Sequence, residues 1–138
     1  MEKKLLIVDD EVTTLFAYKR LFETAGVGVE TARTLEEGQA FLKDHPVEVI
    51  ITDLRLSGKR PEGGFDILRF AKNCQPETKV ILITAYGSSE VIKKAYELGA
   101  SYYLEKPVQI KTLREVLLRL GIDTTAKHAM NGAPEGSE

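Results

Sequence analysis

Short apolar runs alternate with longer amphipathic stretches along the chain as far as about residue 121. This alternation is typical of a parallel sheet whose strands are connected by helices that cover it. Three of the apolar runs are almost entirely aliphatic, which is expected of strands that are buried on both faces. The pattern therefore predicts a doubly wound α/β fold with five strands, at residues 5–8, 29–32, 49–52, 80–84 and 102–104.

The amphipathic stretches predict five helices, because apolar residues recur in them at helical spacing. In the first helix Val12, Phe22 and Ala25 belong to the inward stripe, which a glycine then ends. The second helix starts with a capping box, in which Glu37 follows Thr34 by three residues. The helices are expected at about residues 12–25, 34–45, 65–73, 88–99 and 108–121.

The composition fits one globular domain. The chain has 138 residues and a net charge of −2, so it lacks the basic excess of nucleic-acid-binding domains. Its single cysteine, Cys74, excludes an internal disulfide and continues the inward stripe of the third helix. No apolar stretch approaches the roughly 20 residues that span a bilayer, and an acidic pair interrupts the first apolar run too early for a signal peptide. We therefore expect a cytoplasmic protein without direct contacts to nucleic acid or membrane.

The last residues differ from the rest of the chain. Residues 123–138 show no apolar periodicity and are rich in small and polar types. Such a segment is typical of a flexible tail or the beginning of a linker. The sequence therefore predicts a folded domain at residues 1–122, followed by this tail.

Carboxylates follow two of the aliphatic runs. Asp9 and Asp10 end the run LLIV, and Asp53 ends the run VIIT. In the strand order 2-1-3-4-5, which brings these acids together, the first and third strands are neighbours and the acids lie where open α/β sheets bind ligands. Thr84 and Lys106 follow the fourth and fifth strands. Each acid alone could instead cap a helix, as Asp10 could at the start of the first helix.

The whole set points to one kind of chemistry. Close carboxylates repel one another unless a proton or a cation neutralises them. Oxygen ligands favour a hard ion, and partly hydrated Mg²⁺ suits a site that also takes a phosphate group. The converging acids, hydroxyl and amine therefore predict a site for Mg²⁺ and a phosphoryl group.

Four motifs, VDDE, ITDLRL, ITAYG and YYLEKP, together resemble the receiver domain of two-component response regulators. The resemblance covers about residues 3–121 and implies a CheY-like, flavodoxin-like fold. By position, Asp53 resembles the phosphoacceptor of that family. Asp9 and Asp10 resemble the pair that organises Mg²⁺, with the backbone carbonyl of Arg55 as a further ligand.

The resemblance also implies how a phosphoryl group would be sensed. Thr84 resembles the hydroxyl that moves to bind it, and Lys106 resembles the lysine that pairs with it. Lys106 and Pro107 resemble the residues joined by the family's cis peptide bond. Tyr103 occupies the position of an aromatic switch residue, although an exposed tyrosine on an edge strand is also common without any such role.

Two features set this chain apart from the usual family pattern. After Asp53 the chain reads LRLSGKRPEGGFDIL, which is about three residues longer than the family's usual turn before the third helix. This insertion either is a tolerated surface loop or brings Lys59 or Arg60 to a phosphodonor or partner. Arg55 and Tyr86 flank the pocket with bulky side chains, and we expect them to slow self-dephosphorylation.

The resemblance predicts a regulatory switch that accepts a phosphoryl group from a histidine kinase or phosphotransfer protein and turns over no metabolite. A downstream target, or a second copy of the chain, would bind the surface of the fourth helix, fifth strand and fifth helix. A phosphatase with an aspartyl intermediate is a rival, but it usually needs a second acid where Arg55 stands. A second rival is an interaction module of the same fold that works without phosphorylation. A flavin-binding domain is a more distant alternative.

Overall fold

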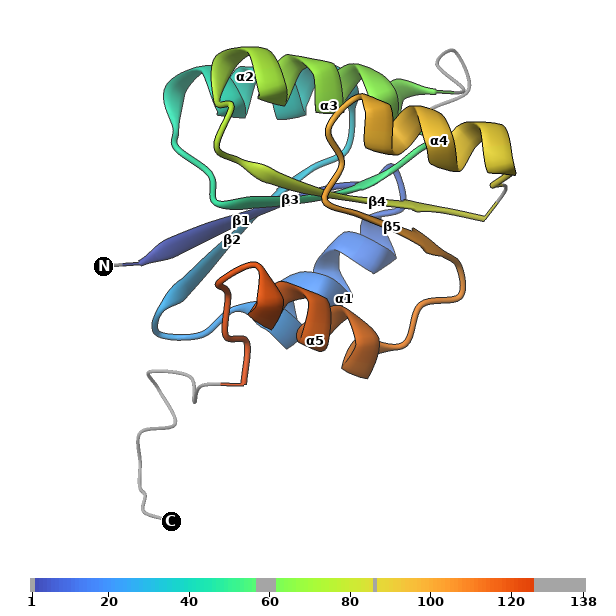
Figure 1. The fold of residues 1–138 in the computed structure, drawn as a ribbon. Helices are drawn as coiled ribbons and strands as arrows, with labels where there is room; N and C mark the ends of the chain where they lie inside the picture. Colours follow the sequence, from blue (N-terminus) through green and yellow to red (C-terminus); the bar gives the residue numbers. More distant parts are fainter. Residues whose placement is uncertain (1, 57–61, 86, 126–138) are drawn as a thin grey trace.

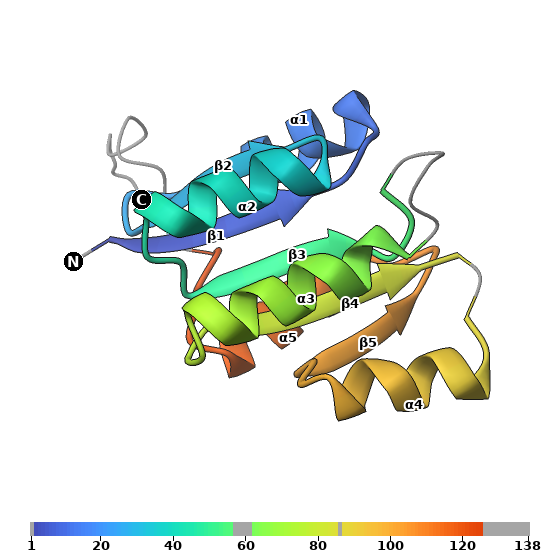
Figure 2. The same ribbon diagram turned by 90° about the horizontal axis from the view of Figure 1, so that it is seen from above.

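The computed structural model describes residues 2–56, 62–85 and 87–125. In this part of the chain five parallel strands form one sheet in the order β2-β1-β3-β4-β5 (Figures 1 and 2). The predicted doubly wound fold and its strand order are therefore confirmed. In chain order the elements are β1 Lys3–Val8, α1 Val12–Phe22, β2 Val27–Ala32, α2 Leu35–Asp44, β3 Val49–Asp53, α3 Gly63–Cys74, β4 Lys79–Thr84, α4 Ser89–Glu97, β5 Tyr102–Glu105 and α5 Ile110–Arg119.

The helices form two layers, and each layer closes its own apolar core. Helices α2, α3 and α4 cover one face of the sheet, and α1 and α5 cover the other (Figure 1). Phe65 and Leu68 of α3 are fully buried in the first core, and Phe22 of α1 and Leu117 of α5 are fully buried in the second. Strands β1, β3 and β4 contribute to both cores, which explains why their sequences are aliphatic at almost every position.

The first and third helices differ from the predicted ones. Helix α1 ends at Phe22 rather than near Ala25, because the chain turns there and Thr24 pairs with Val27 in an antiparallel bridge. At its other end Val12 is 52% exposed and does not face the core. Helix α3 begins two residues earlier than predicted, and Cys74 at its last position is exposed rather than inward. At Val12, Ala25 and Cys74 the apolar periodicity continues past the part of the helix that packs on the sheet.

Side-chain caps fix the start of two helices. Thr34 accepts a hydrogen bond from the backbone N–H of Glu37 at 3.0 Å, and Glu37 accepts one from the N–H of Arg33 at 2.7 Å. The predicted capping box is therefore present, although the returning bond reaches one residue further back than the usual arrangement. At the start of α4, Ser88 accepts from the N–H of Val91 at 3.2 Å.

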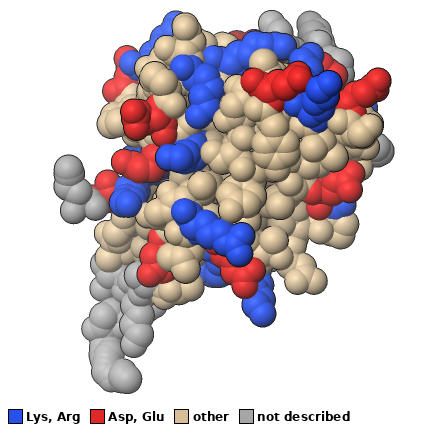
Figure 3. All heavy atoms as spheres, in the orientation of Figure 1, with Lys and Arg blue, Asp and Glu red and all other residues tan. Residues whose placement is uncertain are grey.

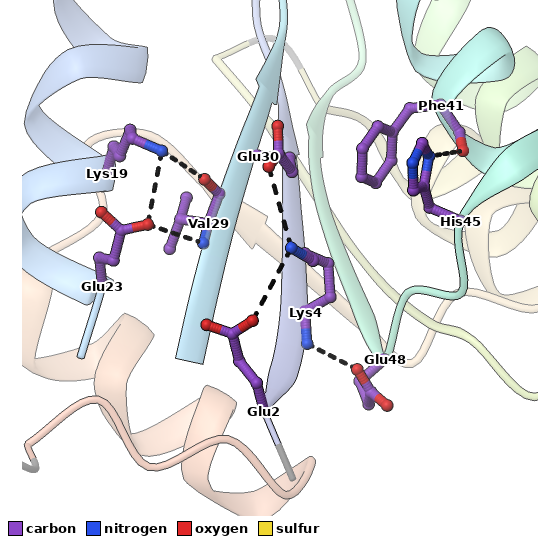
Figure 4. A network of polar contacts seen from close by, with 9 residues as sticks. All are labelled: Glu2, Lys4, Lys19, Glu23, Val29, Glu30, Phe41, His45 and Glu48. Atoms are coloured by element: carbon purple, nitrogen blue, oxygen red, sulfur yellow. Dashed lines mark hydrogen bonds and ion pairs between the residues drawn. The ribbon is translucent and has the colours of Figure 1, made fainter. Parts of the chain in front are cut away.

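The amino ends of the strands carry a network of surface charges (Figure 4). Lys4 of β1 lies 3.8 Å from Glu30 and 4.0 Å from Glu2, and its backbone N–H donates to Glu48 at 2.6 Å. Exposed ion pairs of this kind contribute little to stability, so we assign them no more than a local role. No helix in the described ranges is long and apolar enough to cross a membrane.

A glycine at the start of α3 holds that helix against the end of β3. A Cβ atom on Gly64 would lie 2.5 Å from the carbonyl oxygen of Asp53 and 2.7 Å from the Cα of Leu54. Both neighbours are backbone atoms, so they cannot rotate away. The Gly64 N–H also donates to the Leu54 carbonyl at 2.8 Å, which fixes the close approach.

We therefore predict that Gly64→Ala lowers the free energy of unfolding by about 2 kcal/mol, as overpacking of a close contact does. Gly26→Ala is the matched control, because a Cβ there has no neighbour within 4 Å. It should change stability by less than about 1 kcal/mol. Urea denaturation measures both variants, and equal values for the two would contradict this packing.

Candidate functional site

The sheet register brings the chemically distinctive residues to one edge. Val8 pairs with Thr52, so Asp9 and Asp53 follow side by side on adjacent strands. Thr84 pairs with Glu105, and the N–H of Lys106 donates to the Thr84 carbonyl at 3.0 Å. The carboxyl ends of four parallel strand segments thus deliver these groups to the same region.

A cleft of about 330 Å³ opens at this edge. Four of the residues identified from the sequence as a metal and phosphoryl site line it, and so does the pocket-flanking Arg55. Asp9 does not line it, because its side chain is turned to the interior and is only 5% exposed. The lining residues are Asp10, Glu11, Asp53, Arg55, Thr84, Ala85 and Lys106.

The closest polar contact in the cleft joins Lys106 to Asp53. The Lys106 ammonium lies 2.7 Å from Oδ2 of Asp53, whose side chain is 12% exposed. The other carboxylate oxygen, Oδ1, accepts a hydrogen bond from the N–H of Arg55 at 3.2 Å. Burial alone would lower the pKa of Lys106, but its bond to Asp53 and the nearby acids outweigh this effect and raise the pKa. Lys106 is therefore charged, and Asp53 is held in place with one edge facing the cleft.

Asp9 is buried close to the Asp53–Lys106 pair. Its Oδ1 accepts a hydrogen bond from the backbone N–H of Glu11 at 2.9 Å. Burial raises the pKa of Asp9 to about 6, and the charges of Asp53 and Asp10 act in the same direction. The Glu11 N–H and the Lys106 ammonium lower it, but they do not compensate. The Asp9 carboxylate is consequently an unfavourable charge in this structure unless a further cation is present.

The alternative that Asp10 caps the first helix is not what the structure shows. The N-cap position of α1 is Glu11, and no side chain caps the helix there. Asp10 is instead exposed at the mouth of the cleft. Glu11 also lines the cleft, although no sequence motif assigned it a role. Its position directly after the acidic pair could have indicated this.

The donor groups fit a hydrated magnesium ion. In the described ranges, no three His, Cys, Asp or Glu side chains are grouped closely enough to make a metal site by themselves. Mg²⁺ does not require such a group, because it keeps several waters and is usually bound by one or two carboxylates. Asp10 and Asp53 both face the cleft, and the backbone of Arg55 lies beside them.

Thr84 and the switch candidates lie around the same edge. Thr84 is fully buried at the end of β4, and the Lys106–Pro107 peptide bond is cis. Tyr103 is half-buried and packs against the core under α4, whereas its neighbour Tyr102 packs on the opposite side of the sheet. Tyr86 and the inserted residues Lys59 and Arg60 lie outside the described residues.

The fold and this cleft define a doubly wound α/β domain with an acidic, lysine-bearing site at its strand ends. The family model of the response regulator receiver domain matches residues 5–118. The chain therefore belongs to the response regulator receiver family, whose members are signalling modules of two-component phosphorelays rather than classical enzymes.

Two relatives illustrate the range of this family. The acid tolerance regulatory protein ActR of Rhizobium meliloti is 34% identical over 86% of this chain and 59% of its own length. The sporulation initiation phosphotransferase F of Bacillus subtilis is 29% identical over 85% of this chain and 92% of its own length. The chain thus spans about three fifths of the length of ActR but nearly all of the shorter relative.

Solved receiver structures share the fold. A CheY-like receiver from Methanospirillum hungatei superposes with a TM-score of 0.78 at 31% identity, over 87% of this chain and 94% of that one. A Burkholderia pseudomallei regulator with a phosphorylated aspartic acid and a calcium ion superposes with a TM-score of 0.73 at 26% identity. The match covers 81% of this chain and 64% of that one. The beryllofluoride-activated NtrC4 receiver dimer has a TM-score of 0.76 at 29% identity, over 85% of this chain and 94% of that one.

The raised pKa of Asp9 predicts a specific pH dependence in metal-free buffer. The unfolded chain has the ordinary Asp pKa of 3.8, so above pH 6 the folded protein must hold a charge that burial disfavours. This penalty is fully present above pH 6 and disappears as the pH falls toward 4. Asp9→Asn should therefore stabilise the protein by up to about 3 kcal/mol at pH 7.5 and have almost no effect near pH 4.

Asp44→Asn is the matched control, because it removes an exposed carboxylate at the end of α2, on another part of the surface. It should change stability by less than about 0.5 kcal/mol at either pH. Urea denaturation in the presence of a chelator measures both variants. A destabilising effect of Asp9→Asn at pH 7.5 would contradict the buried-charge account.

Proposed function

We propose that the chain is a phosphorylation-activated receiver that accepts a phosphoryl group on Asp53 with the help of Mg²⁺. The observation that carries this proposal is the 2.7 Å contact between Lys106 and Asp53 in a cleft that is open to solvent. An aspartate that only stabilised the fold would not need an exposed edge. This one has a charge partner on one side and a cleft on the other.

The residues around Asp53 suit the reaction. A carboxylate oxygen of Asp53 attacks phosphorus, the bond from phosphorus to the donor's leaving atom breaks, and an aspartyl phosphate results. Attack of one anion on another is slow unless positive charge offsets the repulsion. Lys106 supplies one such charge, and Mg²⁺, when bound, supplies another. Asp10, Asp53 and the Arg55 carbonyl are the groups that would hold the ion.

Asp9 has a different task in this proposal. Its side chain is buried and does not line the cleft, so its charge would attract the ion from a distance instead of coordinating it directly. Burial raises its pKa, and the nearby Lys106 ammonium only partly offsets this effect. A bound divalent ion would relieve this imbalance, which gives the site part of its preference for the metal-bound state.

The product would be sensed by Thr84 and Lys106. A phosphoryl group adds negative charge and acceptor oxygens at the sheet edge. The Thr84 hydroxyl would donate to one oxygen, and the Lys106 ammonium would transfer its contact from Asp53 to another. Tyr103 would respond to the movement of Thr84 and alter the surface of α4, β5 and α5.

That surface is the proposed output side of the domain. Figure 3 shows that the face carrying α4 and β5 has charges of both signs dispersed around a largely uncharged centre. Either a downstream target or a second copy of the chain would bind there. The receiver dimer among the similar structures supports the second possibility. We propose a histidine kinase or phosphotransfer protein as the phosphodonor. Cytoplasmic location and the end of the domain near residue 122 stay predictions, although Thr124 is still buried.

The direct test is modification by a small phosphodonor. With Mg²⁺ and acetyl phosphate, intact-mass spectrometry should show one added phosphoryl group on the wild-type chain and none on Asp53→Asn. Lys106→Ala should react at least about tenfold more slowly, because it removes the charge that offsets the repulsion. Lys111→Ala, an exposed lysine on α5, is the matched control and should react at the wild-type rate. Modification of Asp53→Asn to the same extent would contradict the assignment.

Arg55 yields a separate prediction about the lifetime of the phosphoryl group. Its side chain lines the cleft beside Asp53, where it would obstruct an attacking water. Arg55→Ala should therefore shorten the half-life of the phosphorylated chain by about twofold or more, a modest steric effect on a barrier. Phosphate release after removal of the donor measures it, and an unchanged half-life would reject this role for Arg55.

A further inference from the structure

Strand β2 forms one edge of the sheet, so half of its backbone groups have no neighbouring strand to bind. The carbonyls of Gly26 and Ala32 accept hydrogen bonds from β1 at 2.9 and 3.0 Å. In this parallel register the even-numbered residues therefore face β1. Val27, Val29 and Thr31 consequently present their N–H and C=O groups to the outside of the sheet.

The C-terminal end of α1 closes the first two of these outward positions (Figure 4). Val27 exchanges two backbone hydrogen bonds with Thr24, at 3.1 and 3.3 Å. At Val29 two side chains take the place of a backbone. The Lys19 ammonium donates to the Val29 carbonyl at 2.7 Å, and a carboxylate oxygen of Glu23 accepts from the Val29 N–H at 3.3 Å. The same Glu23 oxygen lies 3.4 Å from the Lys19 ammonium.

One donor and one acceptor, held together as an ion pair, thus replace the sixth strand that Val29 could bind. With the pair in place Val29 is only 1% exposed, whereas the side chains of Lys19 and Glu23 are 45% and 41% exposed. An exposed ion pair contributes little by its own attraction. Backbone groups left unpaired beside a buried residue are costly. The importance of the pair therefore lies in its two bonds to the strand.

We propose that the Lys19–Glu23 pair closes the β2 edge against strand addition, and that loss of the pair lets residues 29–32 bind the same segment of a second copy. In the part of the chain that the structure describes, Thr31 has no comparable cap, so Val29 and Thr31 would then form a row of open groups. Two copies related by a two-fold axis bring identical edge strands together in antiparallel orientation.

The sequence of β2 gives little protection once the pair is lost. Val29 and Thr31 are β-branched residues, which favour strand pairing. Glu30 is the one charged residue of the strand, and charge on an edge normally keeps strands apart. Here Lys4 lies 3.8 Å from Glu30 and partly neutralises it. This inference concerns the unphosphorylated protein and does not depend on the proposed function.

Analytical ultracentrifugation without any phosphodonor tests the closure. The double variant Lys19→Ala/Glu23→Ala keeps the net charge, and its dimer dissociation constant should be at least about tenfold lower than that of the wild type. Asp66→Ala/Arg69→Ala is the matched control, because it also removes a helical ion pair, on the opposite face of the sheet. It should sediment like the wild type. Equal association of the two double variants would overturn the proposal.

A proline at position 31 tests whether association uses the β2 edge. The Thr31 N–H faces outward, so Thr31→Pro removes no bond to β1 but prevents addition of a strand. In the Lys19→Ala/Glu23→Ala background it should restore the sedimentation of the wild type, and urea denaturation checks that each variant is folded. Association that persists with proline would come from another surface or from partial unfolding, and would reject the β2 edge as the interface.

Hydrogen exchange followed by NMR tests the bond to the strand directly in the single variant Glu23→Ala. This variant loses the acceptor of the Val29 N–H, so the Val29 amide should exchange about tenfold faster, as expected for one lost hydrogen bond. The Glu30 amide faces β1 and should keep its rate. An unchanged Val29 amide would contradict the role of Glu23 at this edge.

Discussion

A carboxylate that is mostly removed from water needs a counter-charge, and Lys106 provides one for Asp53 at 2.7 Å. This contact depends on the order of the strands, because Asp53 follows β3 and Lys106 follows β5, with β4 between them. It also depends on Gly64, which lets α3 start directly behind the Asp53 backbone. The helices and both cores therefore serve to hold one ammonium group and one carboxylate at a common edge.

The same edge holds more negative charge than one lysine can offset. Asp9 is buried beside the pair with its pKa raised to about 6, and Asp10 is exposed at the cleft mouth. An arrangement that is unfavourable by itself responds strongly to a cation or to a change of charge. The cost in stability is thus a physical origin of the sensitivity that a switch requires.

Much of this arrangement could be predicted from the sequence. Aliphatic runs ending in acids give both the strand order and the convergence of Asp53, Thr84 and Lys106, because parallel strands share a carboxyl edge. The sequence could not show that Asp9 is buried while Asp10 faces the cleft. The directions of two neighbouring side chains after a strand depend on the local backbone conformation, which the sequence pattern does not reveal. Nor could it show the role of Gly64, which appears only when two backbone segments approach. Periodicity likewise extended α1 too far, because it does not register the turn at Thr24.

The most direct test of the central claim is a crystal structure of the chain with Mg²⁺ and the phosphoryl mimic fluoroberyllate. The account predicts beryllium bonded to a carboxylate oxygen of Asp53, the Lys106 ammonium moved onto a fluorine, and the metal between Asp10 and Asp53. Fluoroberyllate bound elsewhere, or Lys106 still paired with an unmodified Asp53 at saturating mimic, would contradict it.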